Sequence, residues 1–375
     1  MKKLQILEAI GLLVGTVVGA GFLSIPYVVA KVGLPLGLMM ILGIGSLMLV
    51  QFLIIAEMVL RTRDQHQIAG YVSKYLGRKW RILIYALVVL ESYGALLAYI
   101  VAEGKVLSAV FGGSEFFFSL GYFVLVAGIV YVGLRLVEKV DLILVCLVAV
   151  VVIVIGLLGW SHLRFDSVLI SRPEDLLPAY GVILFSFLGA GAIPQMMRAL
   201  SLNGQQRELP KAVVFGALIP MTIYTIFTVV VLGITGLATT EVATIGLGRS
   251  LGPAVMIIGN LLAAITMTTS FLGLSLALKE TFIWDLKKSR LEAWLLTVIV
   301  PFILFIYGLQ NFIGILMFVG AVFGGLQGII MIAASMRAER LGDREPEFKV
   351  PAKKFFAAIL VLMFLSGIIY TFISR

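Results

Sequence analysis

GTVVGAGFLSIPY, residues 15–27, lies inside the first long apolar run of the chain, where a lipid-crossing helix would be regular. Gly19 and Gly21 weaken a helix there, and Pro26 removes one backbone donor and one hydrogen bond of the helical ladder. Inside lipid every backbone N–H and C=O needs a partner, so such a break persists only where it is buried in protein or lines a cavity. Close helix packing is the alternative, because a glycine recurs every four residues from Gly11 to Gly19. Packing leaves Gly21 and Pro26 unexplained.

The composition places the chain in a membrane. Of its 375 residues, 61% are hydrophobic and 13% are charged, against about 25% charged in ordinary soluble proteins. Apolar runs of roughly 20 residues recur along the whole chain, which is the length that crosses a hydrocarbon core as a helix. The runs are continuous rather than alternating, which excludes a strand barrel. We therefore expect an all-α polytopic membrane protein.

Eleven apolar spans are expected in a single transmembrane domain covering residues 1–375. They run at about 4–30, 35–60, 80–108, 116–134, 140–160, 176–199, 211–236, 252–279, 292–309, 312–335 and 355–373. With the N-terminus in the cytoplasm, 23 of the 29 Lys and Arg residues fall on the inner side, as the positive-inside rule requires. This split predicts an inner-membrane protein with a cytoplasmic N-terminus and an external C-terminus. It also assigns the net charge of +9 to topology rather than to nucleic-acid binding.

The chain offers little for redox, metal or enzyme chemistry. The single cysteine, Cys146, has no disulfide partner in the chain and is expected to pack as a small apolar residue. His66 and His162 lie near loops without cysteines or carboxylates at metal spacing. The spans contain no combination of nucleophile, base and metal ligands. We therefore expect neither an enzyme nor an organic cofactor, and no metal other than a sodium ion.

The sixth span repeats the broken pattern of the first. It reads LLPAYGVILFSFLGAGAIPQMMRAL, and its GAG at residues 189–191 matches the GAG at residues 19–21, 170 positions earlier, with a proline after each. Five spans separate the two starts, so the two segments cross the membrane in opposite directions. Interrupted helices in corresponding halves point to a transporter with inverted repeats. We expect a LeuT-type 5+5 inverted repeat, at about 4–160 and 176–335, with helices 1 and 6 as the only broken ones and an eleventh helix at about 355–373.

The broken backbone indicates the chemistry of the ligand. N–H groups without helical acceptors, together with the positive end of a half-helix, suit a carboxylate. Free carbonyls and the negative end of the other half suit an ammonium group or a small cation. A molecule with both charges at α-amino-acid spacing fits between them. A tyrosine of the third span, Tyr93 or Tyr99, is expected either to donate to the carboxylate of such a substrate or to pack between helices.

Polar residues deep in two other spans are candidates for ion coupling. The eighth span contains TMTTS at residues 266–270, whose oxygens suit a hard cation such as sodium; bonding of the hydroxyls to i−4 carbonyls is the alternative. Glu91 lies roughly 16 Å beyond Trp80 along the third span and is the candidate proton site, with a structural hydrogen bond as the alternative. Glu57 is one turn from Arg61 and is expected to pair with it.

With these features the chain resembles the amino acid–polyamine–organocation superfamily. Within it, the amino acid/auxin permeases and the bacterial hydroxy and aromatic amino acid permeases are the most similar. The resemblance rests on GTVVGAGFLSIPY at 15–27, AEMVLRT at 56–62 and TSFLGLSLALKETFIWDL at 269–286, and by topology it covers almost the whole chain. It implies a secondary transporter that imports an amino acid by alternating access, coupled to sodium or protons.

The same resemblance implies a set of binding residues. Three amides would hold the substrate carboxylate, those around Gly19, Ala20 and Gly21. Three carbonyls would hold its amino group, those of Val17, Phe185 and Phe187, and Phe187 would also contact or gate the side chain. The cation would be held by the carbonyls of Gly15, Val18 and Thr266 and the hydroxyls of Thr269 and Ser270. A second sodium site is expected to be absent, because Phe22 stands where such a site needs an amide side chain.

Several alternatives stay open at this point. An amino acid exchanger, or a sensor derived from a transporter, would keep the same binding residues. A channel is disfavoured because the chain has no repeated filter and no charged pore ring. A pocket floored by Phe187 and small residues favours a neutral, aromatic substrate side chain. Sodium is favoured by the hydroxyls of the eighth span and protons by Glu91, and no pattern indicates an oligomeric state.

Overall fold

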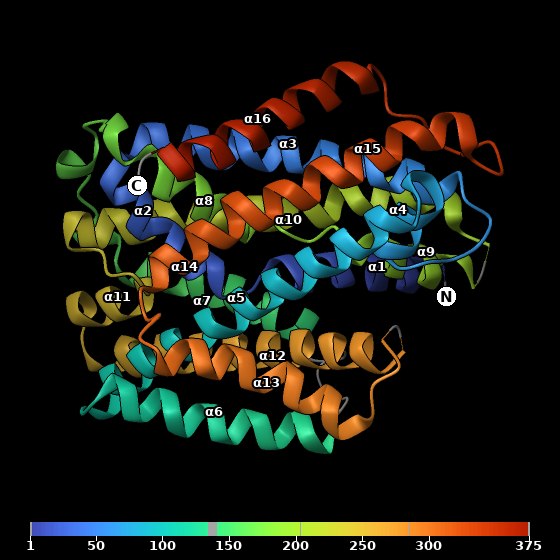
Figure 1. Ribbon diagram of the computed structural model, residues 1–375. Helices are drawn as coiled ribbons and strands as arrows, with labels where there is room; N and C mark the ends of the chain where they lie inside the picture. Colours follow the sequence, from blue (N-terminus) through green and yellow to red (C-terminus); the bar gives the residue numbers. More distant parts are fainter. Residues whose placement is uncertain (1, 134–140, 203, 285, 374–375) are drawn as a thin grey trace.

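The computed structural model describes residues 2–133, 141–202, 204–284 and 286–373, and it is built from helices packed side by side (Figure 1). The two ends of the chain lie at opposite ends of the helical bundle (Figure 1). A chain that crosses a membrane an odd number of times has its two ends on opposite sides. Among the described residues, seven helices are individually long and apolar enough to cross a membrane, and one bent pair forms an eighth such span.

The first span is broken as the sequence predicts. It consists of α1 (Lys2–Val17), a 3-10 turn η1 (Ala20–Ser24) and α2 (Ile25–Val32), and the two arms are bent by 49°. The Gly19 amide does not continue the helical ladder but donates to the carbonyl of Val17 at 2.9 Å. Pro26 lies in the first turn of α2, where its missing N–H leaves no bond unmade.

The sixth span is broken at the matching place. It consists of α8 (Leu176–Ser186) and α9 (Ala192–Ser201), joined by residues 187–191. Short turn hydrogen bonds replace the helical ladder there, from the Leu188 amide to the Phe185 carbonyl at 3.1 Å and from the Ala192 amide to the Gly189 carbonyl at 3.0 Å. α8 packs against η1 and α2, so the two interruptions lie together.

Helices occupy the other predicted spans as well. Their bounds are α3 (Leu34–Leu60), α5 (Arg78–Phe111), α6 (Glu115–Val132), α7 (Asp141–Leu158), α10 (Leu209–Thr235), α12 (Pro253–Trp284), α13 (Arg290–Ile306), α14 (Phe312–Phe318) with α15 (Gly325–Leu341), and α16 (Lys353–Ile373). Two shorter helices, α4 (Ile68–Leu76) and α11 (Ala243–Leu251), lie in the connections. The prediction for the Cys146 side chain falls outside the described residues, as do residues 134–140.

The tenth span contains an irregular turn, although it is not broken as the first and sixth spans are. Between α14 and α15 the chain forms a π-helix, η8 (Val319–Gly324). Gly320 allows a close approach to α8, because a Cβ there would clash with the Gly181 carbonyl oxygen. The π-turn lets the tenth span approach the sixth at backbone distance. In a π-turn the hydrogen bonds join residues five apart instead of four, so the helix of the tenth span continues through it.

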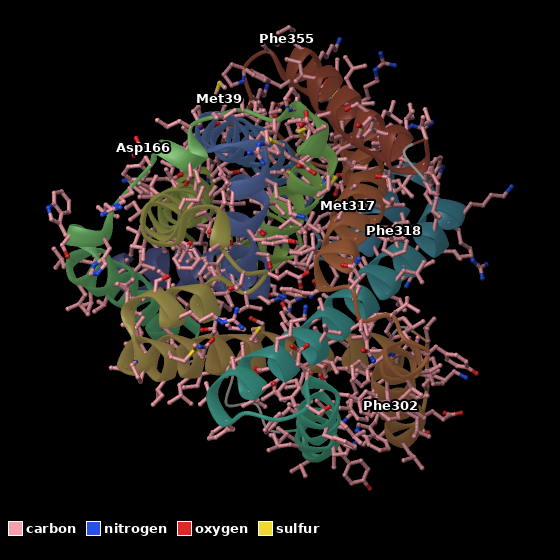
Figure 2. The ribbon with its side chains drawn as sticks, turned by 90° about the vertical axis from the view of Figure 1, so that its left-hand side faces the viewer. Met39, Asp166, Phe302, Met317, Phe318 and Phe355 are labelled. Atoms are coloured by element: carbon pink, nitrogen blue, oxygen red, sulfur yellow. The ribbon has the colours of Figure 1, made fainter. Side chains whose placement is uncertain are left out.

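The helices form two groups with α5 between them. α6, α12 and α13 lie below α5 in Figure 1, and α3, α8, α10 and α16 lie above it; α1 packs against α10 of the upper group. Figure 2 shows the same division: Phe302 of α13 lies far from Met39 of α3 and Phe355 of α16, with Met317 of α14 between them. α5 packs against both α6 and α12 on one side and α14 on the other. The breaks lie in the group that contains α1 and α8.

Ion pairs fasten the end of the bundle where the N-terminus lies. The predicted pair of Glu57 and Arg61 is confirmed, at 2.9 Å, and Lys353 at the start of α16 lies 3.3 Å from the same Glu57 oxygen. Asp343, in the loop between α15 and α16, binds Lys74 of α4. The Lys74 ammonium holds the pKa of Asp343 below its usual range. The loop before α16 is thus bound to α3 and α4 by charge.

Candidate functional site

The two broken spans meet at the hydroxyl of one tyrosine. Tyr224 of α10 is fully buried, and its hydroxyl donates toward the carbonyl oxygens of Val17, at 2.8 Å, and Ser186, at 2.9 Å. Val17 is the last residue of α1 and Ser186 the last of α8, so both carbonyls belong to ends where the helical ladder stops. A single hydroxyl proton is shared between the two breaks.

Tyr99 of α5 reaches the first break from the other side. A Cβ placed on Gly19 would stand 2.9 Å from the Tyr99 hydroxyl oxygen and 3.6 Å from Oγ of Ser270 on α12. Tyr93 instead donates a hydrogen bond to the Leu296 carbonyl of α13 at 2.9 Å. The structure therefore separates the two candidate tyrosines: Tyr99 faces the break, and Tyr93 ties α5 to α13.

Gly19, Gly21 and Gly189 of the breaks are required for space, whereas a Cβ on Gly191 would have no atom within 4 Å. A Cβ on Gly21 would stand 2.6 Å from Oγ of Ser186 and 2.9 Å from the Phe185 ring, and a Cβ on Gly189 would stand 2.5 Å from the Val17 side chain. Gly19 has an ordinary extended backbone, with φ −112° and ψ −157°. Close approach of the first and sixth spans, rather than a special dihedral angle, explains these glycines.

Aromatic rings line the meeting point of the breaks. Phe187, directly after α8, is 2% exposed, and its ring lies 5.1 Å from that of Tyr224. Phe22 stacks parallel to Tyr224 at 5.9 Å and meets Phe227 edge-on at 5.2 Å. The contact of Phe187 with a substrate side chain stays a prediction. Phe22 is engaged in ring packing.

Protein groups already use two of the carbonyls expected to hold an amino group. The Val17 oxygen accepts from the Gly19 amide, at 2.9 Å, in addition to Tyr224. A carbonyl oxygen has two lone pairs, so an amino group at Val17 would displace Tyr224 or share its place. The Phe185 oxygen accepts from the Leu188 amide at 3.1 Å and also faces the Phe187 amide. Ala20 and Gly21 are buried beside them in η1.

The eighth-span residues expected to hold a cation lie together on α12. The Thr269 hydroxyl donates to the Thr266 carbonyl at 3.0 Å, and the Thr266 hydroxyl donates to the Leu262 carbonyl at 2.8 Å. The Thr266 bond is the i−4 back-bond that the sequence left as the alternative, and the Thr269 bond reaches back three residues. Ser270 faces the first break next to Gly19. The Ser270 hydroxyl is therefore the one of the motif that lies at the break. The binding of a cation there stays a prediction.

The two helix 1 residues expected at the cation site border the break. The Val18 amide still donates to the Val14 carbonyl, at 2.8 Å, but the next amide, of Gly19, turns to Val17. The Gly15 carbonyl therefore does not receive the Gly19 amide that a continuing helix would supply. A carbonyl left in this way is the kind of ligand that a small cation uses.

Glu91 lies in a contact between two helices. It is half-buried on α5 and accepts a hydrogen bond from the side-chain amide of Gln327 on α15. This is the structural hydrogen bond that the sequence left as the alternative. Glu91 precedes Tyr99 by two turns, roughly 12 Å along the helix. Its role as a proton site stays a prediction.

Two residues near the breaks escaped the sequence analysis. Tyr224 is a lone tyrosine in an apolar helix and belongs to no motif, so the sequence carried no signal for it. Glu103, 1% exposed on α5, did carry one, because it is an acidic residue inside the predicted span 80–108. Lys105 follows two residues later, and two charged residues so close together are typical of the polar end of a membrane helix.

A cavity opens at the other end of α2. It measures about 300 Å³ and lies where α2 meets the segments before α8 and after α10. Its polar lining consists of Tyr27, Lys31, Arg172, Asp175 and Thr239. A much smaller apolar cavity of about 20 Å³ lies between α7, α10 and α12 and is bordered by Phe22 and Thr266.

Two broken helices that meet inside a bundle of membrane-spanning helices define the LeuT fold, and comparison with solved structures agrees. The crystal structure of MhsT in complex with L-phenylalanine superimposes with a TM-score of 0.69, covering 98% of each chain at 18% identity. The expected fold class is thereby confirmed.

Sequence comparison identifies the family. The chain belongs to the tryptophan/tyrosine permease family, whose pattern matches residues 2–372. Among curated relatives, tyrosine-specific transport system 1 of Haemophilus influenzae is 24% identical over 88% of this chain and 87% of its own. Glutamine transporter 2 of Aliivibrio fischeri is 23% identical over 83% of each. The chain is an amino acid transporter of the membrane and not an enzyme.

Proposed function

We propose that this protein imports a neutral amino acid, with an aromatic side chain preferred, by alternating access coupled to a cation. The observation that carries the proposal is the position of Tyr224, whose hydroxyl joins the carbonyl ends of both broken helices. A zwitterion placed between these ends meets amides and carbonyls of opposite polarity. The tyrosine and glutamine named for the two relatives, and the phenylalanine of the MhsT complex, all have uncharged side chains.

In this proposal the first break holds the amino acid backbone and the aromatic rings hold its side chain. The carboxylate lies at the amides around Gly19, Ala20 and Gly21, within reach of the Tyr99 hydroxyl. The amino group lies at the carbonyls of the sixth span, chiefly those of Phe185 and Phe187. The packing of Phe187 against Tyr224 supports this placement, because a ring beside Phe187 would extend an existing aromatic cluster.

Sodium is the coupling ion that we propose first. Its site comprises the carbonyls of Gly15, Val18 and Thr266 and the hydroxyls of Thr269 and Ser270. The proximity of Ser270 to Gly19 and the loss of the Gly19 amide from Gly15 support it. A proton bound at Glu91 is the second candidate, supported by the burial of a carboxylate in a spanning helix.

The proposal includes the topology and the moving parts. The N-terminus lies in the cytoplasm and the C-terminus outside, in agreement with the charge split and with chain ends on opposite sides (Figure 1). The two repeats, residues 4–160 and 176–335, exchange access to the site by moving against each other, and the helix at 355–373 is an addition. We also propose membership of the wider amino acid–polyamine–organocation superfamily.

Uptake by the purified protein in proteoliposomes tests the proposal. A panel of labelled amino acids is offered under a sodium gradient alone and a proton gradient alone. We expect tyrosine, phenylalanine or tryptophan to accumulate under the sodium gradient. Binding without uptake under either gradient would support a sensor instead. Uptake only against preloaded amino acid would support an exchanger.

A further inference from the structure

A second acidic residue lies deeper in the protein than Glu91. Glu103 follows it by twelve residues on α5 and is 1% exposed. The Thr268 hydroxyl of α12 donates to its carboxylate at 3.2 Å. Within the described part of the chain no Lys or Arg forms an ion pair with Glu103, and Lys105 pairs with Glu241 instead. A hydroxyl rather than a cation therefore holds this carboxyl group.

A tyrosine of α6 completes its surroundings. The Tyr122 hydroxyl is buried close to Thr268 and interacts electrostatically with Glu103. Glu115, in the first turn of α6, is the charged residue of that helix, and it is exposed. The charged residues of α12 and α13 lie at the far ends of those helices: Lys279, Glu280, Arg290 and Glu292. α14 and η8 have no titratable residue.

The Glu103 cluster, defined as Glu103, Thr268 and Tyr122, lies directly behind the first break. Tyr99 is one turn before Glu103 and on the same face of α5, and its hydroxyl is the one next to Gly19. The ring of Phe271 meets those of both Tyr99, at 6.5 Å, and Tyr122, at 5.8 Å. Thr268 immediately precedes Thr269 and Ser270 of the proposed cation site.

The chemistry of this cluster fits a proton. A charged carboxyl group inside a membrane is costly unless a proton or a cation neutralises it. Hydroxyls can donate to the charged carboxylate and accept from the neutral acid, so Thr268 and Tyr122 can serve both states without rearrangement of the helices.

We propose that Glu103 is a proton-binding site that is filled when the amino acid binds. The proposal rests on the proposed function, since it requires a substrate carboxylate at Gly19, beside Tyr99. A charged Glu103 and the substrate carboxylate would repel each other strongly in a medium of low dielectric constant. The proton comes from water and adds to one carboxylate oxygen of Glu103, and it returns to water when the amino acid leaves. No other bond forms or breaks.

The test measures proton uptake and amino acid binding on the same sample. Purified full-length protein in weakly buffered detergent solution, at constant sodium, receives L-tyrosine in the presence of a pH indicator dye. Binding of labelled tyrosine is measured in parallel. We expect wild type to take up as much as one proton per tyrosine bound. Glu103→Gln should bind tyrosine without proton uptake, because its side chain is already neutral.

Matched variants locate the proton. Glu241→Gln makes the same chemical change at the pair with Lys105 and should retain proton uptake. Thr268→Val and Tyr122→Phe keep the carboxyl group, so they should retain the stoichiometry and change the pH at the midpoint of uptake by about one unit. They also serve if Glu103→Gln does not fold, because an unchanged midpoint in both would overturn the proposal.

The remaining outcomes separate this proposal from the proposed function. Tyrosine binding by wild type without proton uptake would overturn the Glu103 site and leave the transporter proposal intact. Proton uptake that survives in Glu103→Gln but is lost in Glu91→Gln would move the site to Glu91. Wild type that binds no amino acid of the panel would contradict both proposals.

Discussion

The hydroxyl of Tyr224 lies 2.8 Å from the carbonyl oxygen of Val17, at the point where α1 ends. The same hydroxyl lies 2.9 Å from the carbonyl of Ser186, where α8 ends. One side chain from α10 thus holds the ends of two half-helices that come from opposite halves of the sequence. A change in the spacing of the breaks must alter at least one of these two contacts.

Tyr224→Phe removes this link and leaves the ring in place. We expect the rate of uptake at low substrate concentration to fall about tenfold, because two buried carbonyls lose a donor at a cost of about 1–3 kcal/mol. Labelled-substrate uptake in proteoliposomes measures the change. Tyr180→Phe is the matched control, since the Tyr180 hydroxyl donates to the Met363 carbonyl, away from the breaks. Equal losses in the two variants would contradict a special role for Tyr224.

Gly21→Val should abolish uptake while folded protein remains in the membrane. Its Cβ alone would stand 2.6 Å from Oγ of Ser186, so α8 has to move away from η1 and the site loses its shape. Gly43→Val places the same side chain on α3 at a position with no atom within 4 Å. This control should transport normally. Normal substrate affinity in Gly21→Val would show that the carboxylate is bound elsewhere.

Sodium coupling is tested by removing two hydroxyls. If sodium drives uptake, Thr269→Ala combined with Ser270→Ala should strongly weaken the dependence of uptake on sodium concentration, because two of the proposed ligands are lost. Glu91→Gln should then be tolerated, since Gln327 can still bond to an amide side chain. If protons drive uptake through Glu91, that variant should stop accumulation while exchange survives. Full uptake in sodium-free buffer at a fixed proton gradient would overturn sodium coupling.

Cysteine labelling tests the topology. In a background with Cys146 replaced by alanine, a cysteine at Ser374 should react with a membrane-impermeant reagent added to intact cells, because the charge split places the C-terminus outside. A cysteine at Gln205, between α9 and α10, should react only after the cells are opened. Labelling of the Ser374 position exclusively from the cytoplasm would reverse this assignment.

The two breaks could be predicted from the sequence because glycine and proline change the backbone itself. Glycine weakens a helix and proline removes one of its hydrogen bonds, so the combination of Gly21 with Pro26, repeated around the GAG at residues 189–191, predicts interruptions from local sequence alone. The pair of Glu57 and Arg61 was readable for a similar reason, because its partners are one turn apart on one helix.

The contacts that join distant helices were not readable in this way. Tyr93 and Tyr99 are equally plausible on sequence, and only the packing of α5 decides that Tyr99 faces Gly19. Tyr224 meets Val17 across more than 200 positions of the chain, and no local pattern records such a pairing. The π-helix before α15 likewise depends on the approach of Gly320 to α8, which VGAVFG alone does not reveal.

The π-helix η8 has a consequence for the register of the tenth span. A π-turn accommodates about one residue more than an α-turn, and one residue rotates a helix by about 100°. The segment can therefore be understood as a single-residue insertion that the helix absorbed without being broken. Deleting one residue within Val319–Gly324 would restore an ordinary helix and turn everything after it. Gln327 would then leave Glu91, and the Ser335 carbonyl would leave the Lys353 ammonium that it now binds at 3.0 Å.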